Sequence, residues 1–171
     1  MGIQMKIREA TARDVAEIAR IHVTSWRVAY AGKLPRTVVA QHSLAQRQNL
    51  WQQRYQTDGV LVAEDNGEIV GFIAGGPQRR HADLEAPYPQ EVYGLYVDPA
   101  QQHRGVGYQL WQARIAEWSA WTVDCLATNS GALRFYTRQG GQLVQAGEYL
   151  ANQQTFPTRV LGFHQSVPEG D

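Results

Sequence analysis

Apolar and polar residues follow two different periods along this chain, and these periods predict its strands and helices. Short runs that alternate, or that are apolar throughout, predict strands at residues 5–9, 60–64, 69–74, 91–97, 122–127, 142–150 and 155–163. Apolar residues at three- and four-residue spacing predict a helix from Val15 that stops by Gly32 and Pro35, a second from Ser43 through Arg54, and two more at residues 107–119 and 131–138.

Polar residues at the ends of these runs support the predicted boundaries. Thr11 and Asp14 have the spacing of a capping box ahead of the first helix. Asn66-Gly67 between two apolar runs predicts a tight hairpin. Asn129 is suited to cap the last helix, which Gly140 then ends.

The composition is that of a globular protein with no strong charge. The chain has 171 residues, which fits a single domain over 1–171, with a flexible tail expected after about residue 164. Its 16 Lys and Arg balance 16 Asp and Glu, so we expect neither a nucleic-acid partner nor an anionic membrane partner. The single cysteine, Cys125, the lack of a membrane-length apolar run and the lack of a signal peptide make the cytoplasm the expected compartment.

A glycine turn between the strand at 91–97 and the following helix is the strongest chemical signal. Gly105 and Gly107 leave the start of the helix open, so that its unpaired N–H groups form an anion site suited to a phosphate, with Arg104 at the rim. A dinucleotide fingerprint would need a third glycine where Leu110 stands, and a P-loop would need Lys-Ser or Lys-Thr after its last glycine. Neither of these motifs is present.

What remains resembles the acetyl-CoA motif of the GNAT superfamily of N-acyltransferases. The resemblance rests on Gln102-x-x-Gly105-x-Gly107 after a strand, with Asn129, Ala132 and Phe135-Tyr136 downstream. It implies an α+β fold with a central, mostly antiparallel, seven-stranded mixed sheet flanked by about four helices. It also implies acetyl-CoA as co-substrate, no metal, and parallel fourth and fifth strands that splay apart around the pantetheine. Gly94 suits either a bulge that drives the splay or close packing.

The resemblance also assigns residues to the cofactor. It implies that the pantetheine pairs with the backbone of Leu95, Tyr96 and Val97 and contacts Asn129 and Ala132. It further implies that the pyrophosphate takes backbone N–H groups along Gln102, Arg104, Gly105, Val106, Gly107 and Tyr108. In this pattern the Tyr136 phenol hydrogen-bonds the CoA sulfur, so it is the predicted general acid for the leaving thiolate.

Glu91, at the start of the fourth predicted strand, is the candidate general base. His81, Asp83 and Glu85 on the preceding loop are rival candidates, and a water chain with no single base is a further alternative. Cys125 has no evident His partner, which favours a buried structural thiol and direct attack in a ternary complex over a covalent acyl-enzyme.

The acceptor pocket is expected at Trp26, Tyr30 and Tyr93, although Trp26 and Tyr30, four residues apart, also fit a plain core stripe. The predicted function is acetyl transfer to a primary amine of a small molecule or, less in keeping with the resemblance, of a protein or peptide. The alternative from another class is a non-catalytic acyl-CoA-binding module. Either a monomer or a homodimer is compatible with the sequence.

Overall fold

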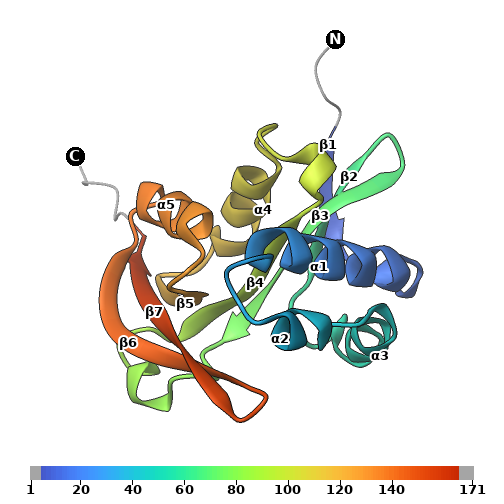
Figure 1. Cartoon of the computed structure of the whole chain (residues 1–171). Helices are drawn as coiled ribbons and strands as arrows, with labels where there is room; N and C mark the ends of the chain where they lie inside the picture. Colours follow the sequence, from blue (N-terminus) through green and yellow to red (C-terminus); the bar gives the residue numbers. More distant parts are fainter. Residues whose placement is uncertain (1–4, 166–171) are drawn as a thin grey trace, which may run out of the picture. The chain divides into compact units, whose positions relative to one another are not determined.

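The computed structural model describes residues 5–165, which form a seven-stranded sheet in the order β1-β2-β3-β4-β5-β7-β6 (Figure 1). The pairs β1–β2, β2–β3, β5–β7 and β6–β7 are antiparallel, whereas β4 and β5 run parallel. The predicted fold class is therefore confirmed, while the outward splay of β4 and β5 stays a prediction. The expected flexible tail falls mostly at 166–171, outside the described residues.

The chain divides into two compact units, and the first comprises residues up to Gly75 together with Tyr93–Ala116. Its elements are β1 (Met5–Glu9), the 3₁₀ turn η1 (Ala12–Asp14), α1 (Val15–Tyr30), α2 (Arg36–Ala40), α3 (Leu44–Arg54), β2 (Leu61–Asp65), most of β3 (Glu68–Pro77), the end of β4 (Gln90–Val97), η3 (Pro99–Gln101) and α4 (Val106–Ile115). The prediction of one domain over 1–171 stays a prediction.

Helices cover both faces of the sheet in this first unit. Phe72 on β3 meets the rings of His22 on α1 and Trp51 on α3, at centroid distances of 6.2 and 5.2 Å. The neighbouring residue, Gly71, lies against side chains of α4. Because successive residues of a strand face opposite sides, α1 and α3 lie on one face and α4 on the other (Figure 1).

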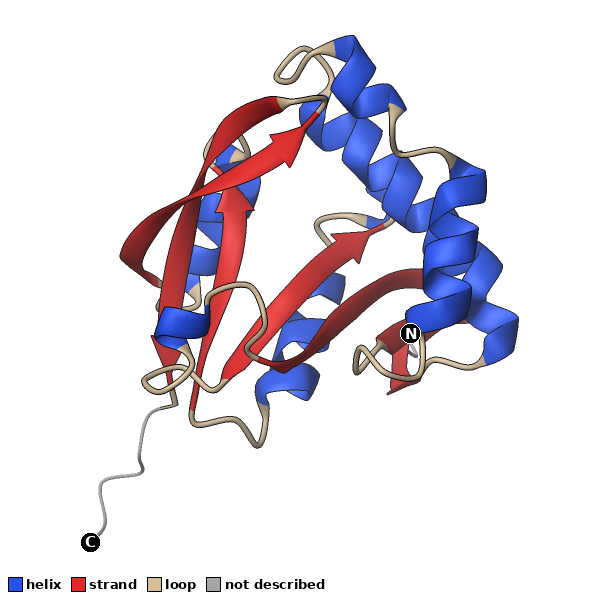
Figure 2. Cartoon of the chain, turned by 90° about the horizontal axis from the view of Figure 1, so that it is seen from below, coloured by secondary structure: helices blue, strands red, loops and turns tan. Residues whose placement is uncertain are grey.

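The second unit comprises Gly76–Val92 and the chain from Glu117 onward. It holds the start of β4, the loop with the 3₁₀ turn η2 (Ala82–Leu84), β5 (Ala120–Leu126), α5 (Ser130–Arg138), β6 (Gln142–Ala151) and β7 (Gln154–His164). β6 and β7, which match the strands predicted at 142–150 and 155–163, form a long antiparallel hairpin (Figure 2). The parallel register of β4 with β5 runs from the pair Gln90 and Trp121 to the pair Val92 and Val123.

The structure differs from the sequence prediction in two helices. α1 ends at Tyr30, and Pro35 is instead the N-cap of α2, a short helix that apolar periodicity over so few residues does not reveal. The helix predicted at 107–119 is α4, which ends at Ile115, so Trp118 lies beyond it and contacts Trp121 instead. The predicted hairpin turn is confirmed, since Asn66 and Gly67 both have positive φ, as a type I′ turn requires.

Two buried histidines stand on the Phe72 face. His22 accepts a hydrogen bond at its Nδ1 from Trp51 Nε1 at 3.0 Å, and its ring lies 6.0 Å from that of His42. Burial, then the charges of Arg47 and His42, lower the pKa of His22 from 6.5 to about 3. Burial and then Arg47 lower the pKa of His42 to about 4. Both rings are therefore neutral at pH 7.

These lowered pKa values predict acid sensitivity. The folded-state pKa of His22 lies below its unfolded value, so the unfolded chain binds more protons and stability falls as pH drops below about 6.5. From pH 7 to pH 5 the free energy of unfolding should fall by about 2 kcal/mol through His22. His22→Asn, whose amide oxygen can accept from Trp51, should reduce this loss in calorimetric melts. An identical loss in both proteins would contradict the assignment.

Candidate functional site

The glycine turn of the first unit opens α4. Gly105 adopts φ +79°, the left-handed region that favours glycine, and is the N-cap of the helix. The first bond within the helix joins Gln109 N to Gly105 O at 3.1 Å. The N–H groups of Val106, Gly107 and Tyr108 therefore have no acceptor within the helix. The first turn of α4 holds no acidic residue, so the positive end of the helix dipole is not offset there.

Arg104 lies beside this turn, and its side chain forms an ion pair with Asp65. Its guanidinium lies 2.9 Å from Asp65 Oδ2 at the end of β2 and also hydrogen-bonds Gln101. The side chain is 34% exposed, so a phosphate could reach it from solvent in competition with Asp65. Gln102, His103 and Tyr108 are exposed.

The predicted pantetheine strand, Leu95 to Val97, is half-buried. The Tyr96 ring lies 4.4 Å from that of His22, and Val97 O accepts a hydrogen bond from Ser25 Oγ at 3.0 Å. A Cβ on Gly94 would come within 2.7 Å of the Tyr96 ring, so glycine at this position makes room for the tyrosine. This supports the packing explanation for Gly94, and the roles of these residues toward a cofactor stay predictions.

The predicted acceptor aromatics lie in an interior group of rings in the first unit. The Trp26 ring lies 4.4 Å from that of Tyr30 and stacks on His42 at 3.8 Å. Tyr93 is partly buried against the hydrophobic core. Sequence reasoning missed both His22 and His42 in this group. His22 precedes Trp26 by four residues, the same spacing as Trp26 to Tyr30, and this helical period could have revealed it.

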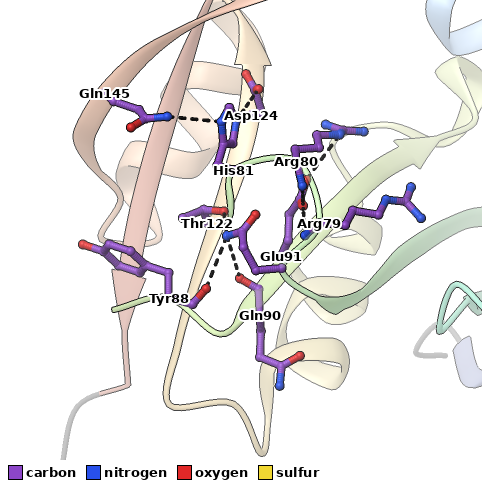
Figure 3. Close-up of polar contacts among 10 residues, drawn as sticks. Arg79, Arg80, His81, Tyr88, Gln90, Glu91, Thr122, Asp124 and Gln145 are labelled. Carbon is purple, nitrogen blue, oxygen red and sulfur yellow. Dashed lines mark hydrogen bonds and ion pairs between the residues drawn. The ribbon is translucent and has the colours of Figure 1, made fainter. Parts of the chain in front are cut away.

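Glu91, the candidate base, lies in the second unit, and its carboxylate is fully buried. Its Oε1 accepts the backbone N–H groups of Arg79 and Arg80, each at 3.1 Å, and its Oε2 lies 3.2 Å from Arg80 Nε (Figure 3). Buried charges of this kind are stabilised by donors from the chain. Glu91 therefore holds the loop that leads from β3 into β4.

Tyr136 and Asn129 lie at opposite ends of α5 in the same unit. Asn129 Oδ1 caps the helix by accepting from Ala132 N at 3.2 Å, which confirms the predicted cap. Tyr136 is buried, and its ring meets that of Phe135 edge-on at 5.5 Å. The roles assigned to Tyr136, Asn129 and Ala132 toward CoA stay predictions.

Cys125 on β5 has the properties of a structural thiol. Burial first, and then the neighbouring Asp124 carboxylate, raise the pKa of Cys125 to about 12. The thiol is therefore protonated at neutral pH and a poor nucleophile. This favours direct transfer over a covalent acyl-enzyme.

Among the rival bases, Asp83 and Glu85 are exposed, whereas His81 is held between two side chains. Its Nε2 lies 2.8 Å from Asp124 Oδ2, and its Nδ1 lies 3.1 Å from Gln145 Nε2 (Figure 3). Sequence reasoning missed Asp124 and Gln145, because the strand pairing that aligns them joins positions far apart in the chain.

Comparisons with known proteins indicate the family of this chain. A model of the acetyltransferase (GNAT) family matches residues 13–141. The chain is 32% identical over 105 residues to the uncharacterized N-acetyltransferase YuaI of Bacillus subtilis (strain 168). That match covers 61% of this chain and 58% of YuaI, which is less than two thirds of the relative.

Two solved structures share the fold. A GCN5-related N-acetyltransferase from Rhodopseudomonas palustris superposes with a TM-score of 0.75 at 22% identity, over 96% of this chain and 99% of the other. The yncA protein of Salmonella typhimurium, solved with its cofactor acetyl-CoA, gives a TM-score of 0.68 at 23% identity, over 98% and 99% of the two chains. Because the family model covers most of its length, this chain belongs to the acetyltransferase (GNAT) family.

Proposed function

We propose that this protein is an acetyl-CoA-dependent N-acetyltransferase that moves an acetyl group to a primary amine of a small molecule. The observation that carries the proposal is the glycine turn, where Gly105 at φ +79° opens α4 with no acidic residue in its first turn. Three adjacent N–H groups that lack helical acceptors suit a pyrophosphate. Family membership supports acetyl-CoA as the ligand that supplies it.

In this proposal the end of β4 and α5 serve the thioester. Backbone groups of Leu95, Tyr96 and Val97 pair with the pantetheine and stabilise the developing oxyanion. The Tyr136 phenol gives a proton to the leaving thiolate, and Asn129 and Ala132 contact the pantetheine. The high pKa of Cys125 supports attack by the amine itself rather than by an enzyme thiol.

The acceptor assignment rests on charge and aromatic character. The chain has no net charge, which favours a small amine over a strongly charged polymer. Trp26, Tyr30 and Tyr93 supply the aromatic surface for it. Among the described residues, no helix combines the length and apolarity needed to cross a membrane.

Thiol release from acetyl-CoA with a panel of primary amines tests the proposal. Amine-dependent release supports the enzyme. Acetyl-CoA binding without release from any amine would favour a binding module, and no binding would overturn both.

Gly105→Glu, compared with Gly105→Ala, tests the anion site. A Cβ at Gly105 meets no atom within 4 Å, so both variants carry the same backbone strain, about 1–2 kcal/mol, without a clash. Only the glutamate places a negative charge beside the pyrophosphate. Calorimetry should show the Kd for acetyl-CoA at least about tenfold higher for Gly105→Glu than for Gly105→Ala. Equal Kd values would place the phosphate site elsewhere.

Tyr136→Phe tests the general acid. The change removes only the hydroxyl and keeps the buried ring beside Phe135. Turnover should fall by about 100-fold or more, the usual contribution of a general acid, while the Kd for acetyl-CoA stays within about threefold. Unchanged turnover would assign Tyr136 to packing alone.

Glu91→Gln tests whether Glu91 contributes to removal of the acceptor's proton, as the base itself or by holding another base in place. An amine with a pKa near that of lysine, ~10.4, is almost fully protonated at pH 7. The rate should therefore fall most near neutral pH and recover as free amine accumulates at higher pH. Glu148→Gln, on the exposed side of β6, is the matched control and should follow the wild-type pH–rate profile. Superimposable profiles for all three proteins would remove Glu91 from the mechanism.

A further inference from the structure

His81 lies across a row of side chains on one face of the second unit. Asp124 on β5 pairs with Val160 on β7, and Val160 pairs with Gln145 on β6. Paired residues in antiparallel strands point to the same face. The His81 ring bridges the two polar ends of this row and contacts Asp124 and Gln145 (Figure 3).

A β-bulge places the Gln145 amide in the row. The β6–β7 register runs from Leu143 opposite Leu161 directly to Gln145 opposite Val160, so Val144 is the extra residue. In a regular ladder Val144 would stand opposite Val160, and Gln145 would point to the other face. The bulge therefore brings an amide to His81 where an isopropyl group would otherwise lie.

The two contacts determine the state of the imidazole. The Gln145 amide nitrogen can only donate, so His81 Nδ1 accepts and carries no proton. His81 Nε2 then carries the proton and donates it to Asp124 Oδ2. In this arrangement the Nδ1 lone pair accepts an N–H group, as it would from a substrate ammonium.

The Asp124 carboxylate is only partly satisfied by its contact with His81. Its Oδ2 is used by His81, but its Oδ1 is buried with no hydrogen-bond partner among residues 5–165, as is the hydroxyl of Thr158. The Asp124 side chain is 11% exposed. The nearest cation on the loop, Arg80, is paired with Glu91, and Arg159, opposite Cys125, lies on the other face by strand alternation. A cation is the ligand that would complete the charge balance.

The group stands beside the end of the β4–β5 pairing. Val92 and Val123 are the last residues in parallel register, and Asp124 is the next residue of β5. Glu91 holds the backbone N–H groups of Arg79 and Arg80, the two residues before His81, and so fixes where the ring stands.

We propose that His81 Nδ1 takes the proton from the acceptor ammonium, with Asp124 and Glu91 as positioning residues and Gln145 occupying the ammonium's place until the acceptor arrives. This rests on the proposed function, in which an acceptor amine attacks the thioester of acetyl-CoA. Glu91, whose Oε1 is held by two backbone N–H groups and whose Oε2 pairs with Arg80, then orients the base instead of acting as the base.

The proton balance of the step is complete. The ammonium loses one proton to His81 Nδ1, and the resulting amine attacks the thioester carbonyl carbon. The C–S bond breaks as the amide forms. The thiolate takes a proton from Tyr136, which recovers one from the attacking nitrogen. His81 releases its proton to water, so each turnover yields amide, thiol and one proton.

His81→Ala is the first test, with thiol release and acetyl-CoA calorimetry as readouts. We expect kcat/KM at pH 7 to fall about 100-fold or more at unchanged acetyl-CoA affinity, the loss to shrink as pH rises, and added imidazole to restore at least about tenfold. Asp124→Asn should lower kcat without changing that affinity, because asparagine does not hold the ring tautomer. A pH-independent loss without imidazole rescue would overturn the proposal, as would a rate within threefold of wild type.

Gln145→Ala separates a base from a structural network. It uncovers Nδ1, so the acceptor no longer displaces an amide and its KM should fall, whereas the control Gln142→Ala, exposed on the same strand, should leave the acceptor KM unchanged. A loss of kcat matching that of His81→Ala would mean that the group is structural. If the proposed function itself fails, wild-type protein shows no amine-dependent release.

The protonation of the His81 ring can be measured in the wild-type protein, so this test does not depend on whether a variant folds. Nitrogen-15 NMR should show the proton on Nε2 of His81 in the free protein. Saturating acceptor, with a non-hydrolysable acetyl-CoA analogue, should perturb Nδ1 more than Nε2. A proton on Nδ1 in the free protein would contradict the assignment.

Discussion

A carboxylate without any exposure to water must be met by donors from the protein, and Glu91 imposes this constraint on the second unit. Its donors are backbone N–H groups of the loop between β3 and β4, so the loop conformation and the charge depend on each other. The same loop is anchored again where Gln78 Nε2 donates to Thr122 Oγ1 at 2.7 Å. A loop of mostly exposed residues thereby holds a fixed conformation over the sheet.

In the first unit, two polar imidazole rings are buried inside an apolar core. His22 and His42 remain neutral because burial disfavours their charged forms. Each then acts as a flat, polarisable surface: His22 against Tyr96, and His42 against Trp26. Their neutrality links the stability of this unit to pH without requiring any role in catalysis.

Local signals made much of this structure predictable. The glycine turn, the Asn129 cap, the Asn66-Gly67 turn and most strands follow from residues close together in sequence. Features that depend on pairing between distant strands were not predictable. Asp124 and Gln145 meet His81 only because β7 aligns β5 with β6, and the burial of Glu91 follows from a loop that periodicity does not describe. The short helix α2 was missed because five residues are too few to show a helical repeat of apolar positions.

The extra residue at Val144 has a consequence for how the surface beside His81 can diverge within this fold. Because of the bulge, each residue from Gln145 to Ala151 points to the face opposite the one that regular alternation from Gln142 and Leu143 would give it. A regular ladder through the same residues would turn Val144 and Ala146 toward Asp124 in place of Gln145 and Gly147. A shift of the pairing by one residue would therefore remodel the surface beside His81 while every neighbouring side chain kept its identity. Two chains could match at each of these residues and still differ in what they bind.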